Sequence, residues 1–308
     1  MSSEKTSLNI VYMGTPEFAV PPLEALLQTH HKVVGVITVA DKPAGRGRKI
    51  QESAVKKCAS SHDLHIMQPT NLKNEEFLAE LASLEADLFI VVAFRMLPKV
   101  VWNMPRLGTF NLHGSLLPKY RGAAPIHWAV INGDKVTGLT TFLLDEKIDT
   151  GSILLQRTQS IEDGMTTGEL HDALLPLGAE MVVQTTNMLA AGEYEPLPQD
   201  ESLVSHAPKL NKENSRLDWS KTPQDLAHQI HGLNPFPGAY YGEYKFFKAA
   251  PYSETITSTE PKLVVINKML MLTYALGSVQ IIQLKPNGKR LMNAVDFING
   301  MKDQEILL

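Results

Sequence analysis

The chain has 308 residues, 44% of them hydrophobic, and a formal net charge of -4 at pH 7. This length predicts two ordinary domains or one large one, with enough apolar content to fill their cores. The apolar runs fall short of the roughly 20 residues that a transmembrane helix needs, and the opening MSSEKTSLNIVYMG lacks the apolar region of a signal peptide. We therefore expect a cytoplasmic protein without membrane association.

Cysteine content and charge distribution limit the kinds of cross-link, metal site and partner that this protein can have. Cys58 is the single cysteine, which excludes an intrachain disulfide and a cysteine cluster for zinc or iron. Residues 205–308 hold 12 Lys and Arg against 9 Asp and Glu, so the acidic surplus lies in residues 1–204. A mildly basic tail behind an acidic front part is compatible with a polyanionic partner that binds the tail.

Strand and helix patterns alternate over the first part of the chain. Short apolar runs predict buried strands, and apolar residues at helical spacing follow the first two of these runs. The strands are predicted at 8–15, 32–39, 87–94 and 109–114, and the helices at 18–28 and 52–62. The alternation predicts an α/β fold with a doubly wound, mostly parallel sheet, whose ligands bind beyond the carboxyl ends of the strands.

The first domain is predicted to end with a helix. Residues 138–161 predict two strands around a turn that contains Asp149 and Gly151, and residues 166–191 have the pattern of a long amphipathic helix. The following stretch, 192–210, has mixed polarity and no clear period, which is typical of a linker.

The tail has a different character. Short β-rich pieces at 240–250, 261–275 and 277–285, separated by Gly, Pro and Asn, predict a small β-barrel. The sequence therefore predicts a first domain over 1–191, a linker over 192–210 and a second domain over 211–308.

Asn111 and His113 are candidates for chemistry on a carbonyl group. They alternate on the fourth predicted strand, so both point to the same face at the strand's carboxyl end. An Asn amide can donate a hydrogen bond to a developing oxyanion, and a His can carry a proton near neutral pH. Asp149, in the later turn, could orient that His. By residue type alone, a structural or surface position is the more common interpretation for any single His.

Two loops could bind ligands. Residues 115–129, SLLPKYRGAAPIHWA, either line a pocket with Lys119 and Arg121 or form an ordinary connection from a strand to a helix. Residues 41–50, DKPAGRGRKI, are either a phosphate-binding loop or a solvated surface loop. The basic residues of this second loop are Lys42, Arg46, Arg48 and Lys49.

Several site classes lack support. The sequence has no GxGxxG motif, no Walker loop and no GxSxG elbow, so dinucleotide binding, nucleoside triphosphate binding and serine-type covalent catalysis are not indicated. His62 with His65, and His228 with His231, have the spacing of neighbours on a helix but no obvious third ligand. We expect surface positions for them and no metal site.

Six segments, in order and across nearly the whole chain, resemble the methionyl-tRNA formyltransferase family: MGTPEFAV, DKPAGRGRK, FNLHGSLLPKYRGAAPI, DEKIDTG, NPFPGAY and LKPNGKR. NLHGSLLPKYRG with a downstream DTG is shared by folate-dependent formyltransferases in general. The GRGRK loop and the tail resemble the tRNA-acting branch. The resemblance implies a Rossmann-like formyltransferase fold followed by a small OB-like β-barrel domain that helps to hold tRNA.

The resemblance also implies roles for individual residues. The catalytic residues would be Asn111, His113 and Asp149, and the tRNA-binding residues in the basic loop would be Arg46, Arg48 and Lys49. Folate contacts would come from Ser115, Leu116, Leu117 and Pro118. In the tail, Lys245, Lys248, Lys285, Lys289 and Arg290 are tRNA-binding candidates by charge alone.

One segment departs from the family's usual pattern. Where most members that we compare carry AYGxILP, this chain has AFRMLP at 93–98, which is one residue shorter. It resembles the corresponding piece of glycinamide ribonucleotide formyltransferases, which lines the pterin pocket through its backbone. The folate contacts implied there fall on Phe94, Arg95, Met96 and Leu97.

The activity implied is the transfer of a formyl group from the co-substrate 10-formyltetrahydrofolate to the amino group of charged initiator methionyl-tRNA, in support of translation initiation. We expect no metal and no obligate protein partner. One alternative is a formyltransferase acting on an amino sugar or on glycinamide ribonucleotide. Others are a hydrolase that releases formate and a noncatalytic RNA-binding protein that uses the OB-like tail.

Overall fold

The computed structural model describes residues 6–44, 49–252, 256–301 and 303–308. This part of the chain divides into two compact units, each built from segments that are distant in sequence. Unit 1 consists of residues up to 121, 138–159 and 173–205, and unit 2 consists of 122–137, 160–172 and 206–308. The domain ranges expected from the sequence stay a prediction. None of the described helices combines the length and the apolar character needed to span a membrane.

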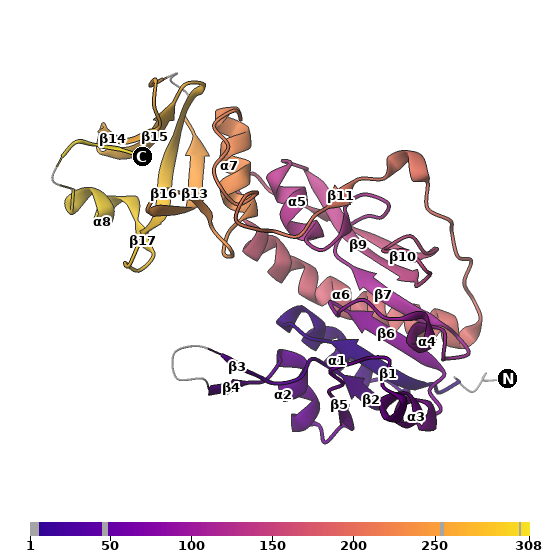
Figure 1. Cartoon of the computed structure of the whole chain (residues 1–308). Helices are drawn as coiled ribbons and strands as arrows, with labels where there is room; N and C mark the ends of the chain where they lie inside the picture. The colour runs from indigo at the N-terminus through magenta and orange to yellow at the C-terminus, as the bar shows by residue number, and fades with distance from the viewer. Residues whose placement is uncertain (1–5, 45–48, 253–255, 302) are drawn as a thin grey trace. The chain divides into compact units, whose positions relative to one another are not determined.

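The main sheet has seven strands in the order β10-β9-β7-β6-β1-β2-β5 (Figure 1). The pairings from β5 to β7 are parallel, whereas β9 pairs antiparallel with β7. All residues of β6 are buried, as expected of a strand covered on both faces. The strands are β1 (Asn9–Gly14), β2 (Lys32–Ile37), β5 (Ile66–Met67), β6 (Leu88–Val92), β7 (Thr109–His113), β9 (Val136–Leu143) and β10 (Ile153–Ser160).

Helices cover both faces of this sheet, which makes it doubly wound. On one face Phe77 of α3 packs in a core cluster with Val11 and Val91. On the other face Gly178 of α6 approaches so closely that a Cβ there would lie 3.1 Å from Leu112 Cδ2. The helices are the 3-10 helix η1 (Glu17–Ala19), α1 (Val20–Leu27), α2 (Ala54–Ser61), α3 (Glu75–Ser83), α4 (Lys99–Trp102) and α6 (Thr167–Ala191).

Unit 2 contains an antiparallel sheet in which six strands follow one another in the order β12-β13-β16-β15-β14-β18. The seventh strand, β17, pairs with β16 outside this order. Asn267 and Lys268 connect β14 to β15 with φ of 51° and 65°, the left-handed pair that a two-residue hairpin turn requires. The strands are β12 (Ala239–Tyr241), β13 (Tyr244–Pro251), β14 (Lys262–Ile266), β15 (Met269–Tyr274), β16 (Gly277–Pro286), β17 (Met292–Asn293) and β18 (Glu305–Leu307).

The predicted fold class, a mostly parallel α/β sheet followed by a small β domain, is confirmed. The sequence did not predict the helix α7, whose Leu226 and Ile230 share a core cluster with Phe246 of β13 and Ile131 of α5. The remaining elements are α5 (Pro125–Ile131), α7 (Pro223–Gly232), α8 (Ala294–Asn299), the 3-10 helix η2 (Glu201–Leu203), β8 (Arg121–Gly122), β11 (His206–Ala207), β3 (Lys42–Ala44) and β4 (Lys49–Gln51).

Candidate active site at the carboxyl end of strand β7

Two of the three predicted catalytic side chains meet at the carboxyl end of β7. His113 is the last residue of that strand and only 6% exposed, and Asp149 lies in the turn between β9 and β10. The Asp149 Oδ2 atom is 3.8 Å from His113 Nδ1. Asn111 stands two residues before His113 on β7, so its side chain lies on the same face of the sheet.

The backbone around His113 determines which ring nitrogen carries the proton. His113 Nε2 lies 2.9 Å from the carbonyl oxygen of Tyr120. Since a carbonyl oxygen can only accept, Nε2 must donate, and in the neutral ring Nδ1 holds the free electron pair. Phe142 packs edge-on against the ring, with centroids 6.4 Å apart. His113 can therefore take up a proton at Nδ1, where the Asp149 carboxylate would stabilise it.

The turn that carries Asp149 has an unusual backbone. Asp149 has φ of 55°, a left-handed conformation that Asp adopts more readily than most residues. Gly151 follows so close to β9 that a Cβ would lie 1.6 Å from the Leu143 carbonyl oxygen. Within the turn, Asp145 Oδ1 accepts a hydrogen bond from Thr150 Oγ1 at 2.7 Å. The DTG sequence thus fits a turn that needs glycine at its third position.

The predicted folate-contacting loop is held by a buried hydroxyl. Thr140 Oγ1 donates to the Ser115 carbonyl oxygen at 2.7 Å and accepts from the Leu117 amide at 3.1 Å. Ser115 and Leu117 are 0% and 3% exposed, whereas Leu116 and Pro118 are partly exposed. The side-chain surface of this loop therefore belongs to Leu116 and Pro118.

The second predicted folate segment, Phe94 to Leu97, joins β6 to α4. The Arg95 guanidinium lies over the Phe94 ring, 5.6 Å from its centroid, and Nη1 donates to the Thr70 carbonyl oxygen at 3.0 Å. Leu97 is buried, while Met96 is 72% exposed. Met96 thus offers an apolar surface that a ligand could cover.

Sequence reasoning did not find Tyr120, Phe142 and Thr140 as parts of this site. Tyr120 contributes its backbone carbonyl, which no side-chain motif reveals. Phe142 and Thr140 lie on β9, opposite Asn111 and His113 of β7. Only the antiparallel register of these two strands would have placed them there.

At the predicted tRNA-binding loop, the two flanking strands β3 and β4 pair antiparallel, with Lys42 opposite Gln51. Arg46 and Arg48 lie outside the described residues, and only the backbone of Lys49 is described, at the start of β4. In unit 2, the exposed Lys245 of β13 stands directly opposite Lys285 of β16. Two neighbouring strands there carry like charges at facing positions.

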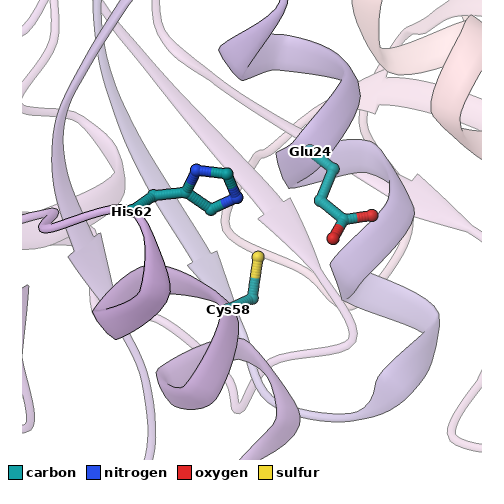
Figure 2. A group of neighbouring side chains, drawn as sticks. All are labelled: Glu24, Cys58 and His62. Carbon is teal, nitrogen blue, oxygen red and sulfur yellow. The ribbon is translucent and has the colours of Figure 1, made fainter.

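A further group of side chains, drawn in Figure 2, could hold a metal ion. The carboxylate of Glu24 on α1, the thiol of Cys58 on α2 and the ring of His62 after α2 have ligand atoms within 4.8 Å of one another. Cys58 is 8% exposed. Its burial raises the pKa of the thiol, and the nearby Glu24 carboxylate raises it further by a smaller amount.

The other histidines that were considered as metal-ligand pairs have different surroundings. His65 Nε2 lies 2.9 Å from Glu80 Oε1. His231, expected at the surface, is 3% exposed and accepts the Ala249 amide at Nε2, 3.2 Å away. The surface expectation is wrong for His231 because α7 buries that side of the helix against β13.

Comparison with known proteins assigns the chain to a family. Residues 8–186 match the formyl transferase family, and residues 209–302 match the formyl transferase C-terminal domain. The methionyl-tRNA formyltransferase of Flavobacterium johnsoniae is 46% identical over 303 residues, covering 96% of each chain. That of Bacteroides fragilis is 45% identical over 311 residues, again covering 96% of each chain.

Solved structures show the same fold at lower identity. The N-formyltransferase of Helicobacter canadensis, in complex with folinic acid and dTDP-3-aminofucose, superposes with a TM-score of 0.68 at 21% identity, covering 89% of this chain and 98% of that one. The chain therefore belongs to the methionyl-tRNA formyltransferase family.

Proposed function

We propose that the chain transfers the formyl group of 10-formyltetrahydrofolate to the amino group of methionine on charged initiator tRNA, in the cytoplasm and without an obligate protein partner. The chemistry rests on one observation, the His113–Asp149 pair at the carboxyl end of β7. The choice of methionyl-tRNA rests on relatives of that name at 45% and 46% identity over nearly the whole chain.

In the proposed reaction the neutral methionyl amine attacks the formyl carbon of the folate directly, with no acyl-enzyme. The Asn111 amide donates a hydrogen bond to the oxygen that becomes negative. His113 Nδ1 accepts the proton of the attacking amine, directly or through a water, and Asp149 stabilises the resulting imidazolium. The imidazolium then returns this proton to the folate nitrogen as the bond between that nitrogen and the formyl carbon breaks, and the new C–N bond to the methionyl amine remains.

Both substrates would meet this centre from defined surfaces. The exposed side chain of Met96 and the partly exposed Leu116 and Pro118 suit the flat faces of the rings of a folate. For tRNA we propose the basic loop, with Arg46, Arg48 and Lys49, and the lysines of unit 2. Like charges at directly facing positions destabilise a sheet unless a counter-charge binds, so the Lys245–Lys285 pair favours a polyanionic partner there.

A formyltransferase that acts on an amino sugar is the second candidate, because the fold also matches that of an enzyme crystallised with such a sugar. The test supplies 10-formyltetrahydrofolate with methionyl-tRNA, with a dTDP-amino sugar, or with no amine. We expect formyl transfer to methionyl-tRNA alone. Transfer to the sugar, or formate release without an amine, would replace the proposed function.

A further inference from the structure

The segment 197–205, which the sequence predicts to be part of a linker, contacts the catalytic turn. The Gln199 side chain donates from Nε2 to the carbonyl oxygens of Asp149 and Gly151, both at 2.9 Å. Its Oε1 accepts from Arg121 Nε at 3.0 Å and Nη2 at 2.8 Å. Every polar atom of this amide is thus engaged, and each contact lies within unit 1.

Arg121 connects Gln199 to the backbone that holds His113, the other residue of the catalytic pair. Arg121 is 7% exposed and binds both carboxylate oxygens of Glu201, at 2.8 and 3.2 Å. This contact lowers the pKa of Glu201. Arg121 directly follows Tyr120, whose carbonyl oxygen accepts the hydrogen bond from His113. The segment therefore reaches the backbone on both sides of the His113–Asp149 pair.

The two backbone positions held in this way are strained. Tyr120 has φ of 61° and Asp149 has φ of 55°, and left-handed residues other than glycine persist only where their surroundings hold them. Ser205 Oγ accepts from the Tyr120 amide at 2.9 Å, and Gln199 holds the Asp149 carbonyl oxygen. A side chain that fixes this carbonyl also fixes the direction of the Asp149 carboxylate.

We propose that Gln199 is a positioning residue for formyl transfer, which sets the Asp149 carboxylate against His113 through the backbone of the catalytic turn. This role rests on the proposed function. It makes the 197–205 segment a structural part of the catalytic centre.

Gln199→Glu is the sharpest test, because Glu has the same size and keeps the acceptor for Arg121 but cannot donate to the two carbonyl oxygens. We expect kcat for formyl transfer to fall by about tenfold or more, as small misplacements of a catalytic group do. KM for both substrates should change little, and the unfolding temperature should fall only modestly, since the two carbonyl oxygens lose their donor while the contact with Arg121 stays. Gln184→Ala is the matched control, since the exposed Gln184 accepts a hydrogen bond from Arg157 at 2.7 Å in the same unit.

Four outcomes are distinguishable. A selective loss of kcat in Gln199→Glu, with normal activity in Gln184→Ala, supports the positioning role. Wild-type kcat in Gln199→Glu overturns it, and so does a loss of kcat that only follows a loss of folded protein. An inactive wild-type enzyme would instead refute the proposed function, so the two failures are distinguishable.

The Glu24, Cys58 and His62 group carries a second, independent inference. Cys58 and His62 are four residues apart, so one turn of helix brings them to the same side. Within the described residues, neither the Cys58 thiol nor the side chains of Glu24 and His62 have a hydrogen-bond partner. Figure 2 shows the three side chains converging from two helices.

We propose that Glu24, Cys58 and His62 bind a Zn²⁺ ion, with water as the fourth ligand. Zinc prefers sulfur, nitrogen and oxygen ligands at about 2.0–2.3 Å from the ion. The three ligand atoms already lie within 4.8 Å of one another, so small side-chain rotations would bring them to one ion. The thiol proton would leave to solvent as the zinc–sulfur bond forms. The proposed formyl transfer does not use this ion.

Equilibrium dialysis against micromolar Zn²⁺ tests the site. We expect one zinc per wild-type chain and loss of that zinc in His62→Gln and Cys58→Ser. His62 is exposed, so its substitution should leave folding intact, and His65→Gln is the matched control because His65 pairs with Glu80. No zinc in the wild type, or equal zinc in the wild type and His62→Gln, would overturn the proposal.

Discussion

His113 depends on its neighbours for its chemical role. Its Nε2 donates to the Tyr120 carbonyl oxygen, which leaves Nδ1 toward Asp149 at 3.8 Å. Asp149→Asn removes the charge that would stabilise a proton there, so we expect kcat to fall by about a hundredfold or more with little change in KM. Steady-state kinetics with methionyl-tRNA measure this.

Asp145→Asn is the control for that substitution, since Asp145 lies in the same turn and its Oδ1 accepts from Thr150 Oγ1. An Asn there keeps the accepting oxygen, so activity should stay within a few-fold of the wild type. Equal activities of the Asp149→Asn and Asp145→Asn enzymes would refute the role given to Asp149.

The sequence predicts which residues are candidates for the site, but it does not predict the hydrogen bonds that hold them. Asn111 and His113 follow from alternation on a strand, and Asp149 from a glycine-containing turn. The ring proton on His113 does not follow, because it depends on a backbone carbonyl of Tyr120. Gln199 carries no motif and lies far along the chain. The functional roles of all these residues stay predictions.

Among the elements, β9 supports the folate loop through one side chain. Thr140 is fully buried and holds the backbone of Ser115 and Leu117. Thr140→Val keeps the shape but leaves buried polar groups unpaired, which should lower the free energy of unfolding by about 1–3 kcal/mol. We also expect a higher KM for 10-formyltetrahydrofolate, measured by denaturant unfolding and initial rates.

Thr141→Val separates these two effects. Thr141 Oγ1 lies 2.8 Å from Thr185 Oγ1 of α6, so this substitution also removes a buried hydrogen bond but leaves the folate loop untouched. It should destabilise the protein without changing KM for the folate. A similar rise in KM in both variants would show that Thr140 does not act through the loop.

Of the five parallel strands, β1, β2, β6 and β7 were predicted from short runs rich in apolar residues, whereas β5 has only two residues and was not predicted. The helix α7 was not predicted. Its apolar residues follow a polar, proline-containing stretch, and their role in the core is visible only from their packing against β13 and α5. The β14–β15 hairpin was predicted as one piece, because Asn267 and Lys268 do not form one of the glycine-containing turn pairs that mark such hairpins.

For the whole molecule, charge distribution decides how a net acidic protein could bind tRNA. Lys285 is exposed and stands opposite Lys245, whereas Lys262 of β14 is paired with Glu305 at 2.8 Å. Lys285→Ala should weaken tRNA binding and reduce its salt dependence by about one unit of the log–log slope. Lys262→Ala should do neither. Equal effects of the two substitutions in filter binding at several salt concentrations would contradict this.

At this scale the sequence was most informative, since six motifs in order predicted a family that relatives at 45% and 46% identity confirm. The mostly parallel sheet and the β-rich tail are confirmed as well. The domain ranges remain a prediction. In the structure, residues 122–137 and 160–172 belong to unit 2, although they lie before the predicted linker.

The most direct test of the account is single-turnover formyl transfer from 10-formyltetrahydrofolate to methionyl-initiator tRNA by the wild type and by Asn111→Ala, with uncharged tRNA as control. The wild type should formylate only the charged tRNA, and loss of the oxyanion donor should slow transfer by about a hundredfold or more. Wild-type rates in Asn111→Ala, or no transfer to charged tRNA by the wild type, would contradict it.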